Sequence, residues 1–169
     1  MYRLMTTLLL GAVLALPVLS QDEGVPIQLV DHWKTSKKYM LALAEQMPAA
    51  DYAFKPNAEE MSFGQQLAHI AGANASFFAT LSGQKNPIGK PANFEKATVL
   101  KMVNDSYDFS IAALAGLKHE RMLETFDTGE GKLTGMELLL LATDHTAHHR
   151  GQLIVYLRAK NIKPVDYQF

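Results

Sequence analysis

The segment 134–159 has apolar residues at helical spacing, and its centre carries the motif Asp144-His-Thr-Ala-His-His-Arg-Gly-Gln152. Three of the six histidines of the chain fall within this motif. An α-helix has about 3.6 residues per turn, so His145 and His149 lie on one face, one turn apart. Two imidazoles in this relation can bind one metal ion. The third ligand of such an ion has to come from another segment of the chain.

The three clustered histidines can pair in two ways. Around the helix axis His145 and His149 differ by about 40°, whereas His145 and His148 differ by about 60° in the opposite direction. Either pair could therefore bind one ion. His148 falls toward the flank of the apolar stripe, which indicates a partly exposed histidine or one that supports a ligand. The stripe favours the pair His145 and His149, because it continues on their side of the helix through Leu138, Leu141, Ala142, Gln152 and Tyr156.

Three further segments, 26–47, 63–81 and 97–117, show apolar residues at helical spacing. Outside the four segments no convincing strand pattern occurs, although Thr125-Phe126 could belong to a short extended piece. Four long amphipathic helices predict an all-α fold, a four-helix bundle, in which metal sites are built from side chains on facing helices. Two of the helices begin with a capping-box pattern: Ser62 with Gln65, and Thr134 with Glu137.

His69 lies in the middle of the second predicted helix, between Ala68 and Ile70. Taken alone, a histidine there is more often a hydrogen-bonded core residue than a metal ligand. The His-x-x-x-His pair on another helix changes this interpretation, because three imidazoles from two helices could bind one divalent ion and leave a coordination position open. The remaining histidines, His32 and His119, have no partner pattern and are expected to be structural or exposed.

The roles of several other residues near this candidate site stay open. Asp144 could orient a ligand imidazole through a hydrogen bond, or form an ordinary surface ion pair with a residue such as Arg150. Gly151 costs about 1 kcal/mol relative to Ala in mid-helix, which a close approach between helices would explain. Tyr107 and Asp108 of the third predicted helix could line the same cavity, or they could be a core aromatic residue and a solvated acid.

Residues 1–20 have the composition of a secretory signal peptide, with a basic start at Arg3, an apolar run and small residues before Gln21. The alternative is an uncleaved N-terminal anchor. The run is short for a spanning helix and is followed by acidic residues, which disfavours the anchor. We therefore expect one folded domain, 21–169, that is secreted or periplasmic and has no membrane segment after cleavage.

Composition excludes several kinds of site. The chain contains no cysteine, which rules out disulfides, thiol nucleophiles and cysteine-ligated zinc. With 16 basic and 17 acidic residues its formal net charge is −1, unlike the strongly basic surface of a nucleic-acid-binding domain. Any metal chemistry therefore depends on histidines and oxygen donors. Imidazole ligands suit Zn, Ni, Cu or Fe.

These motifs together resemble the DinB-like (YfiT-like) family of metalloenzymes. The resemblance covers nearly the whole chain after the predicted signal peptide, with the motifs in the same order and at the same spacing. It rests on three stretches: Tyr52-x-Phe54-Lys55-Pro56, then Met61-Ser62-Phe63-Gly64-Gln65-Gln66-Leu67-Ala68-His69-Ile70, and finally His145-x-x-x-His149-Arg150-Gly151-Gln152.

The resemblance implies a four-helix bundle with a three-histidine site for a divalent metal ion, Zn or Ni, whose ligands here are His69, His145 and His149. His148 has no ligand role in that pattern. The resemblance also implies a small-molecule substrate and a homodimer. Characterised members of the family include thiol-dependent S-transferases and a maleylpyruvate isomerase that use cytosolic low-molecular-weight thiols, whereas the predicted signal peptide places this chain outside the cytosol.

Two functions from different classes remain open. In the first, an open three-histidine site makes the chain a metal-dependent enzyme, either a hydrolase or a thiol S-transferase, with His148, Asp144 or Tyr107 as candidates for proton transfer. In the second, the same histidines hold a metal in a non-catalytic metal- or ligand-binding module. An open coordination position beside a pocket would favour the enzyme. A buried site with a fourth protein ligand would favour the module.

Overall fold

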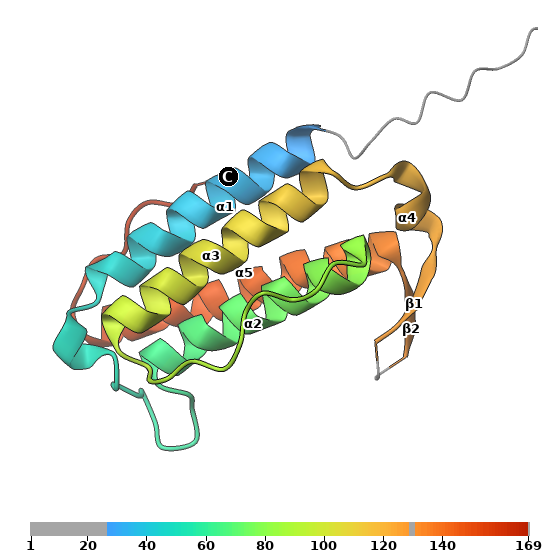
Figure 1. Ribbon diagram of the computed structural model, residues 1–169. Helices are drawn as coiled ribbons and strands as arrows, with labels where there is room; N and C mark the ends of the chain where they lie inside the picture. The colour runs from blue at the N-terminus through green and yellow to red at the C-terminus, as the bar shows by residue number, and fades with distance from the viewer. Residues whose placement is uncertain (1–26, 129–130, 169) are drawn as a thin grey trace, which may run out of the picture.

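The computed structural model describes residues 27–128 and 131–168, so the predicted signal peptide, 1–20, lies outside the described residues. Four long helices pack side by side (Figure 1). The predicted all-α four-helix bundle is confirmed. No helix in the described part of the chain combines the length and the apolar character needed to cross a membrane. The four helices are α1 (Ile27–Gln46), α2 (Phe63–Ser82), α3 (Lys96–Ala115) and α5 (Gly135–Ala159).

Trp33 of α1 is one of the largest side chains in the core and is only 2% exposed. Its ring meets Phe78 of α2 edge-on at 4.6 Å between centroids, and it lies 5.8 Å from the ring of Tyr107 on α3. Such aromatic pairs stabilise a fold by about 0.5–1.5 kcal/mol beyond the area they bury. One side chain therefore joins three helices, while α5 completes the bundle by packing on α1 and α2.

Both predicted capping boxes are present. At the start of α2, the Ser62 hydroxyl accepts from the Gln65 backbone N–H, and the Ser62 N–H donates to the Gln65 side chain at 2.8 Å. At the start of α5, Thr134 and Glu137 make the same reciprocal pair. Each cap satisfies N–H groups that the first helical turn leaves unpaired, and removing one typically costs about 1 kcal/mol. The two helices that carry the clustered histidines therefore have fixed first residues.

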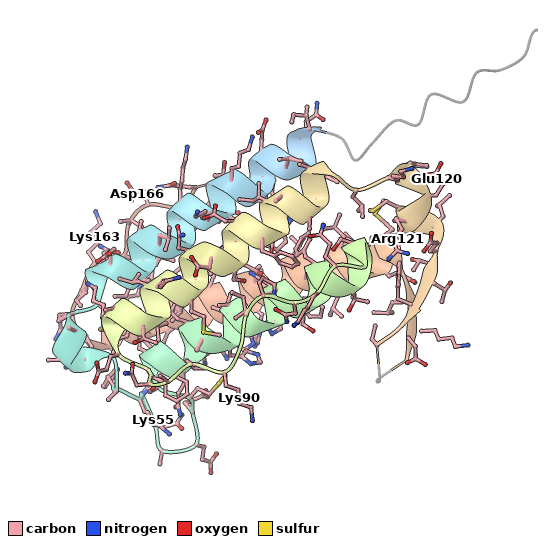
Figure 2. The ribbon with its side chains drawn as sticks, viewed as in Figure 1. Lys55, Lys90, Glu120, Arg121, Lys163 and Asp166 are labelled. Atoms are coloured by element: carbon pink, nitrogen blue, oxygen red, sulfur yellow. The ribbon has the colours of Figure 1, made fainter. Side chains whose placement is uncertain are left out.

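A short helix and a hairpin close one end of the bundle. Arg121, in α4 (His119–Leu123), donates to the carbonyls of Leu81 at 3.0 Å and Thr80 at 3.2 Å, and so caps the C-terminal end of α2 (Figure 2). Its guanidinium also lies 4.6 Å from the centre of the Phe126 ring. The described residues between the long helices form four short elements: η1 (Ala49–Asp51), α4 (His119–Leu123), β1 (Thr125–Asp127) and β2 (Lys132–Thr134).

The hairpin is the main difference from the sequence-based expectation, which held only an uncertain extended piece at Thr125-Phe126. The strands pair antiparallel, with Phe126 opposite Leu133. Each strand has three residues, which is too short for an alternating apolar pattern to be recognised. Thr134 ends the second strand and also caps α5, so the hairpin leads directly into the helix that carries His145 and His149.

Two expectations about α5 were wrong. Leu141 is 40% exposed, whereas Leu138 is 1% exposed. Three positions turn the helix about 60° back from Leu138, which takes Leu141 off the buried stripe. Gly151 does not mark a close approach between helices, because a Cβ added there would have no neighbouring atom within 4 Å. The crowded glycine of α5 is Gly135, where an added Cβ would lie 2.1 Å from the carbonyl oxygen of Arg121.

The two glycines of α5 provide a matched test of this packing. We expect Gly135→Ala to lower the free energy of unfolding by about 1–3 kcal/mol, because the added methyl collides with the backbone of α4. Gly151→Ala should instead raise it by about 1 kcal/mol, since alanine has the higher helix propensity and the position is open. Denaturant unfolding of both variants measures the difference, and a destabilised Gly151→Ala protein would contradict the described packing.

Candidate metal centre

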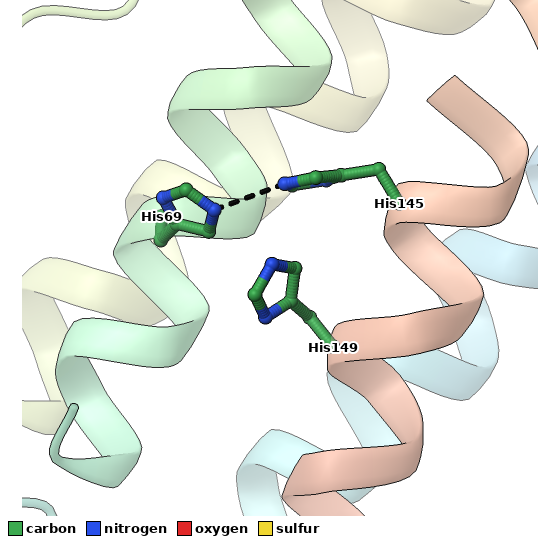
Figure 3. Close-up of side chains that lie close together, drawn as sticks. All are labelled: His69, His145 and His149. Atoms are coloured by element: carbon green, nitrogen blue, oxygen red, sulfur yellow. Dashed lines mark hydrogen bonds between the residues drawn. The ribbon is translucent and has the colours of Figure 1, made fainter. Parts of the chain in front are cut away.

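Three imidazoles from two helices meet between those helices (Figure 3). His69 comes from α2, and His145 and His149 come from successive turns of α5. One ring nitrogen from each lies within 4.8 Å of those from the other two, and Nε2 of His69 is 2.9 Å from Nε2 of His145. The structure therefore brings these three side chains together, as predicted. We call this set the histidine cluster.

The spacing of the histidine cluster fits one divalent ion. An ion that bonds two imidazole nitrogens at about 2.0–2.1 Å holds them roughly 2.9–3.4 Å apart, depending on the coordination angle. The observed 2.9 Å between His69 and His145 lies in this range. In addition, Nδ1 of His145 is buried and has no hydrogen-bond partner among the described residues. Because Nε2 is the nitrogen of His145 that faces His69, this Nδ1 would carry the ring proton and leave Nε2 free to bond the ion.

Two glutamine side chains orient His149. Its Nδ1 lies 2.8 Å from Oε1 of Gln66 and 2.7 Å from Oε1 of Gln152. Because both neighbours are acceptors, Nδ1 carries the proton, and Nε2 keeps a free lone pair. Gln66 is itself fully buried, and its amide lies 3.5 Å from the hydroxyl of Tyr156. The ring of His149 is therefore held by contacts from both helices, as is common for metal-binding imidazoles.

The sequence analysis did not identify this role of Gln66. A local signal existed, because Gln66 lies three positions before His69 and Gln152 lies three positions after His149. Residues at this spacing share a helix face. The spacing alone could not show that Gln66, on α2, contacts a histidine on α5.

Burial favours the neutral form of His145 and His149. It lowers the pKa of His145 to about 4, and the neighbouring rings of His149 and His69 act in the same direction. Burial also lowers the pKa of His149, while its hydrogen bond to Gln152 opposes this effect. A metal ion binds only the neutral imidazole, so a lowered pKa leaves the donors ready for the ion near neutral pH.

The histidine cluster opens to the surface on the side of α2. His69 is exposed, His145 is half-buried and His149 is only 9% exposed. His148 is exposed beside the cluster, with its ring 4.9 Å from that of His149, but none of its nitrogens belongs to the cluster. A ligand from solvent would therefore reach the cluster from the side of His69.

Asp144 has neither of the two roles considered for it: it does not orient an imidazole, and it does not pair with Arg150. Asp144 is exposed, and in the described part of the chain it makes no side-chain hydrogen bond or ion pair. Arg150 points to α1 and the C-terminal tail. Its guanidinium donates to Ser36 Oγ at 3.4 Å and lies 5.2 Å from the ring of Tyr39. The residues of the motif around the histidines therefore lie on two different sides of α5.

The remaining candidates lie away from the cluster. Tyr107 is a buried core residue whose hydroxyl pairs with Ser36, and burial raises its pKa to about 12. Asp108 is exposed and forms an ion pair with Lys37. The simpler interpretations, a core aromatic residue and a solvated acid, are confirmed. His32 on α1 and His119 on α4 are exposed and outside the cluster, as expected.

Comparisons with known proteins agree with this fold. The chain is 29% identical over 136 residues to the uncharacterized protein YjoA of Bacillus subtilis (strain 168), which covers 78% of this chain and 88% of YjoA. The crystal structure of that DinB-like protein superposes with a TM-score of 0.71 at 26% identity, covering 83% of this chain and 96% of that chain. A DinB-like protein from Bacillus cereus ATCC 10987 has a TM-score of 0.73 at 14% identity, covering 85% and 97% of the two chains.

The family pattern extends over most of the sequence. The DinB family profile matches residues 18–165, which include all four long helices and all three residues of the histidine cluster. The likeness to the Bacillus cereus protein, at 14% identity, supports the fold alone. On the extent of the profile match, this chain belongs to the DinB family.

Proposed function

We propose that this chain is an exported, divalent-metal-dependent enzyme that acts on a small molecule at the histidine cluster, by hydrolysis or by group transfer. The observation that carries the proposal is the donor set: among the described residues, no fourth His, Asp or Glu joins His69, His145 and His149. Three protein ligands with an open position are typical of catalytic zinc sites. The exposure of His69 allows a water or a substrate atom to reach that position.

A bound ion and the protein side chains would have different roles at the site. A bound divalent ion would supply Lewis acidity, which lowers the pKa of a water or polarises a carbonyl or thiol group. The three imidazoles would hold the ion, while Gln66 and Gln152 fix the ring of His149. Of the groups considered for proton transfer, His148 is the one whose ring lies beside the cluster. Imidazole donors suit Zn and Ni, and we propose one of these as the ion.

The proposed export rests on the composition of residues 1–20. A secreted or periplasmic enzyme would have no access to cytosolic thiols, so hydrolysis is preferred to thiol S-transfer. The near-neutral net charge of −1 favours a small molecule over nucleic acid as the ligand. We expect no membrane partner after signal cleavage, and the homodimer stays a prediction.

The second candidate is a non-catalytic metal- or ligand-binding module. One observation favours it: the histidine cluster contains no Asp or Glu that could act as a general base. An activity screen separates the two candidates. If the enzyme proposal is right, the zinc-loaded protein hydrolyses at least one class of small ester, amide or lactone substrates, and His69→Ala abolishes the activity. A zinc-loaded protein that is inert toward hydrolytic and thiol-transfer substrates would favour the module.

Metal content tests the three ligands directly. We expect the full-length protein, purified without a His-tag, to contain about one divalent ion per chain, because one three-ligand site holds one ion. Replacing His69, His145 or His149 singly by Ala should strongly reduce the content measured by plasma mass spectrometry. His148→Ala is the matched control and should keep it. Unchanged metal content in all three ligand variants would refute the site.

The lowered pKa of His145 predicts a pH effect in the metal-free protein. The pKa of this imidazole falls from 6.5 to about 4 on folding, so between these values the unfolded chain binds more protons. The free energy of unfolding should therefore be highest above about pH 6.5 and should fall as the pH is lowered toward 4. Denaturation at several pH values measures how the free energy of unfolding changes with pH. A range from about 5 to 7 is suitable because most carboxylates stay ionised there.

A pair of substitutions shows which imidazole causes this pH dependence of the free energy of unfolding. His145→Gln should reduce this pH dependence, and His149, whose pKa burial also lowers, should account for part of what remains. His148→Gln removes an exposed imidazole from the same helix and should leave most of the slope in place. If His145→Gln unfolds with the same pH dependence as the original protein, the slope has another origin.

A further inference from the structure

A cavity of about 300 Å³ borders the histidine cluster. His69 belongs to both: its Nε2 contacts His145 within the cluster, and its side chain also lines the cavity. A larger cavity of about 420 Å³ lies nearby, but none of the three clustered histidines lines it. The smaller cavity is therefore the one that continues the candidate metal site. Its other lining residues are Met61, Gln65, Ala68, Pro91 and Phe94.

The outer wall of this cavity comes from the connection between α2 and α3. This segment, 83–95, runs back along α2 toward the start of α3 (Figure 1). Gly64 allows it to come close, because a Cβ at that position would lie 2.3 Å from the carbonyl oxygen of Phe94. The missing side chain at 64 thus lets Phe94 lie against α2, about one turn before Ala68 and His69.

The chemistry of the walls indicates what the cavity can hold. Four of the six lining side chains, Met61, Ala68, Pro91 and Phe94, are apolar, and the polar ones are Gln65 and His69. Phe94 remains 42% exposed. In the described part of the chain no aromatic ring packs on Phe94. Apolar walls with a few polar groups that set orientation are typical of small-molecule pockets, whose volumes begin at about 300 Å³.

We infer that this cavity binds the apolar group of a small-molecule ligand, about the size of a phenyl ring, whose metal-directed donor atom reaches the histidine cluster past His69. The inference rests on the proposed function, because a metal held by the cluster anchors the polar end of the ligand. The substrate class is therefore a small ester, amide or lactone with an aromatic group next to the carbonyl that would reach the ion.

Two probes test this with the full-length, zinc-loaded protein. Acetohydroxamate and benzohydroxamate share one zinc-binding group and differ by a methyl or a phenyl substituent. We expect benzohydroxamate to bind on the order of tenfold more tightly in calorimetry, since the ring leaves water for the apolar cavity. With methyl-labelled methionine, its binding should shift the NMR signal of Met61, which lines the cavity, but not that of Met136, which is 47% exposed on α5.

Substitution of the outer wall provides the matched comparison. Phe94→Ala removes one apolar wall and leaves the capping box of α2 in place, so we expect the phenyl advantage to fall to about threefold or less. Leu140→Ala removes another exposed apolar side chain, from α5, and should keep the full advantage. Zinc content measured on both variants should match that of the original protein, because neither residue is in the histidine cluster.

The outcomes separate this inference from the proposed function. Equal affinities for the two hydroxamates, or a phenyl advantage that survives in Phe94→Ala, would overturn the cavity assignment and leave the metal site standing. An original protein that binds neither zinc nor nickel would overturn the proposed function, and the inference with it. A Met61 signal that moves with protein concentration and not with either probe would mean that a second copy fills the cavity, which also overturns the inference.

Discussion

The contact between α2 and α5 is the one on which the histidine cluster depends, because the three imidazoles come from these two helices. Buried polar bonds set its register: Thr146 donates to the Asn74 side chain at 2.9 Å, and His149 bonds Gln66 at 2.8 Å. A shift of one helix along the other would leave these groups unpaired in the core, which costs about 1–3 kcal/mol for each. Hydrogen bonds away from the cluster's ligand atoms thus help to fix its geometry.

The sequence predicted those parts of the fold that depend on local patterns. Helical periodicity located the four long helices, and Ser62 and Thr134 marked two of their starts. The cluster needed more: spacing placed His145 and His149 on one face and made His69 a candidate third ligand, and the family resemblance strengthened that assignment. Gln66 and Arg121 were missed because their partners, His149 on α5 and the last carbonyls of α2, are distant in sequence.

The residues of the motif around the histidines do not all serve the same site. Along an α-helix each residue is rotated by about 100° from the one before, so His149 and Arg150 necessarily face different sides. His149 points to α2, whereas Arg150 contacts Ser36 on α1. Gly151 faces outward and makes no close contact in the described part of the chain. One short motif therefore serves the candidate site and the packing of α1 together.

The neutrality of the histidine cluster affects the electrostatics of a loaded site. Cysteine or carboxylate ligands would cancel part of the charge of a divalent ion, but three imidazoles bring none to cancel it. The ion would keep its double positive charge, and the two side chains that hydrogen-bond to Nδ1 of His149 are uncharged amides. Anions would therefore be drawn to the open position, and the coordinated oxygen of a neutral compound would be strongly polarised.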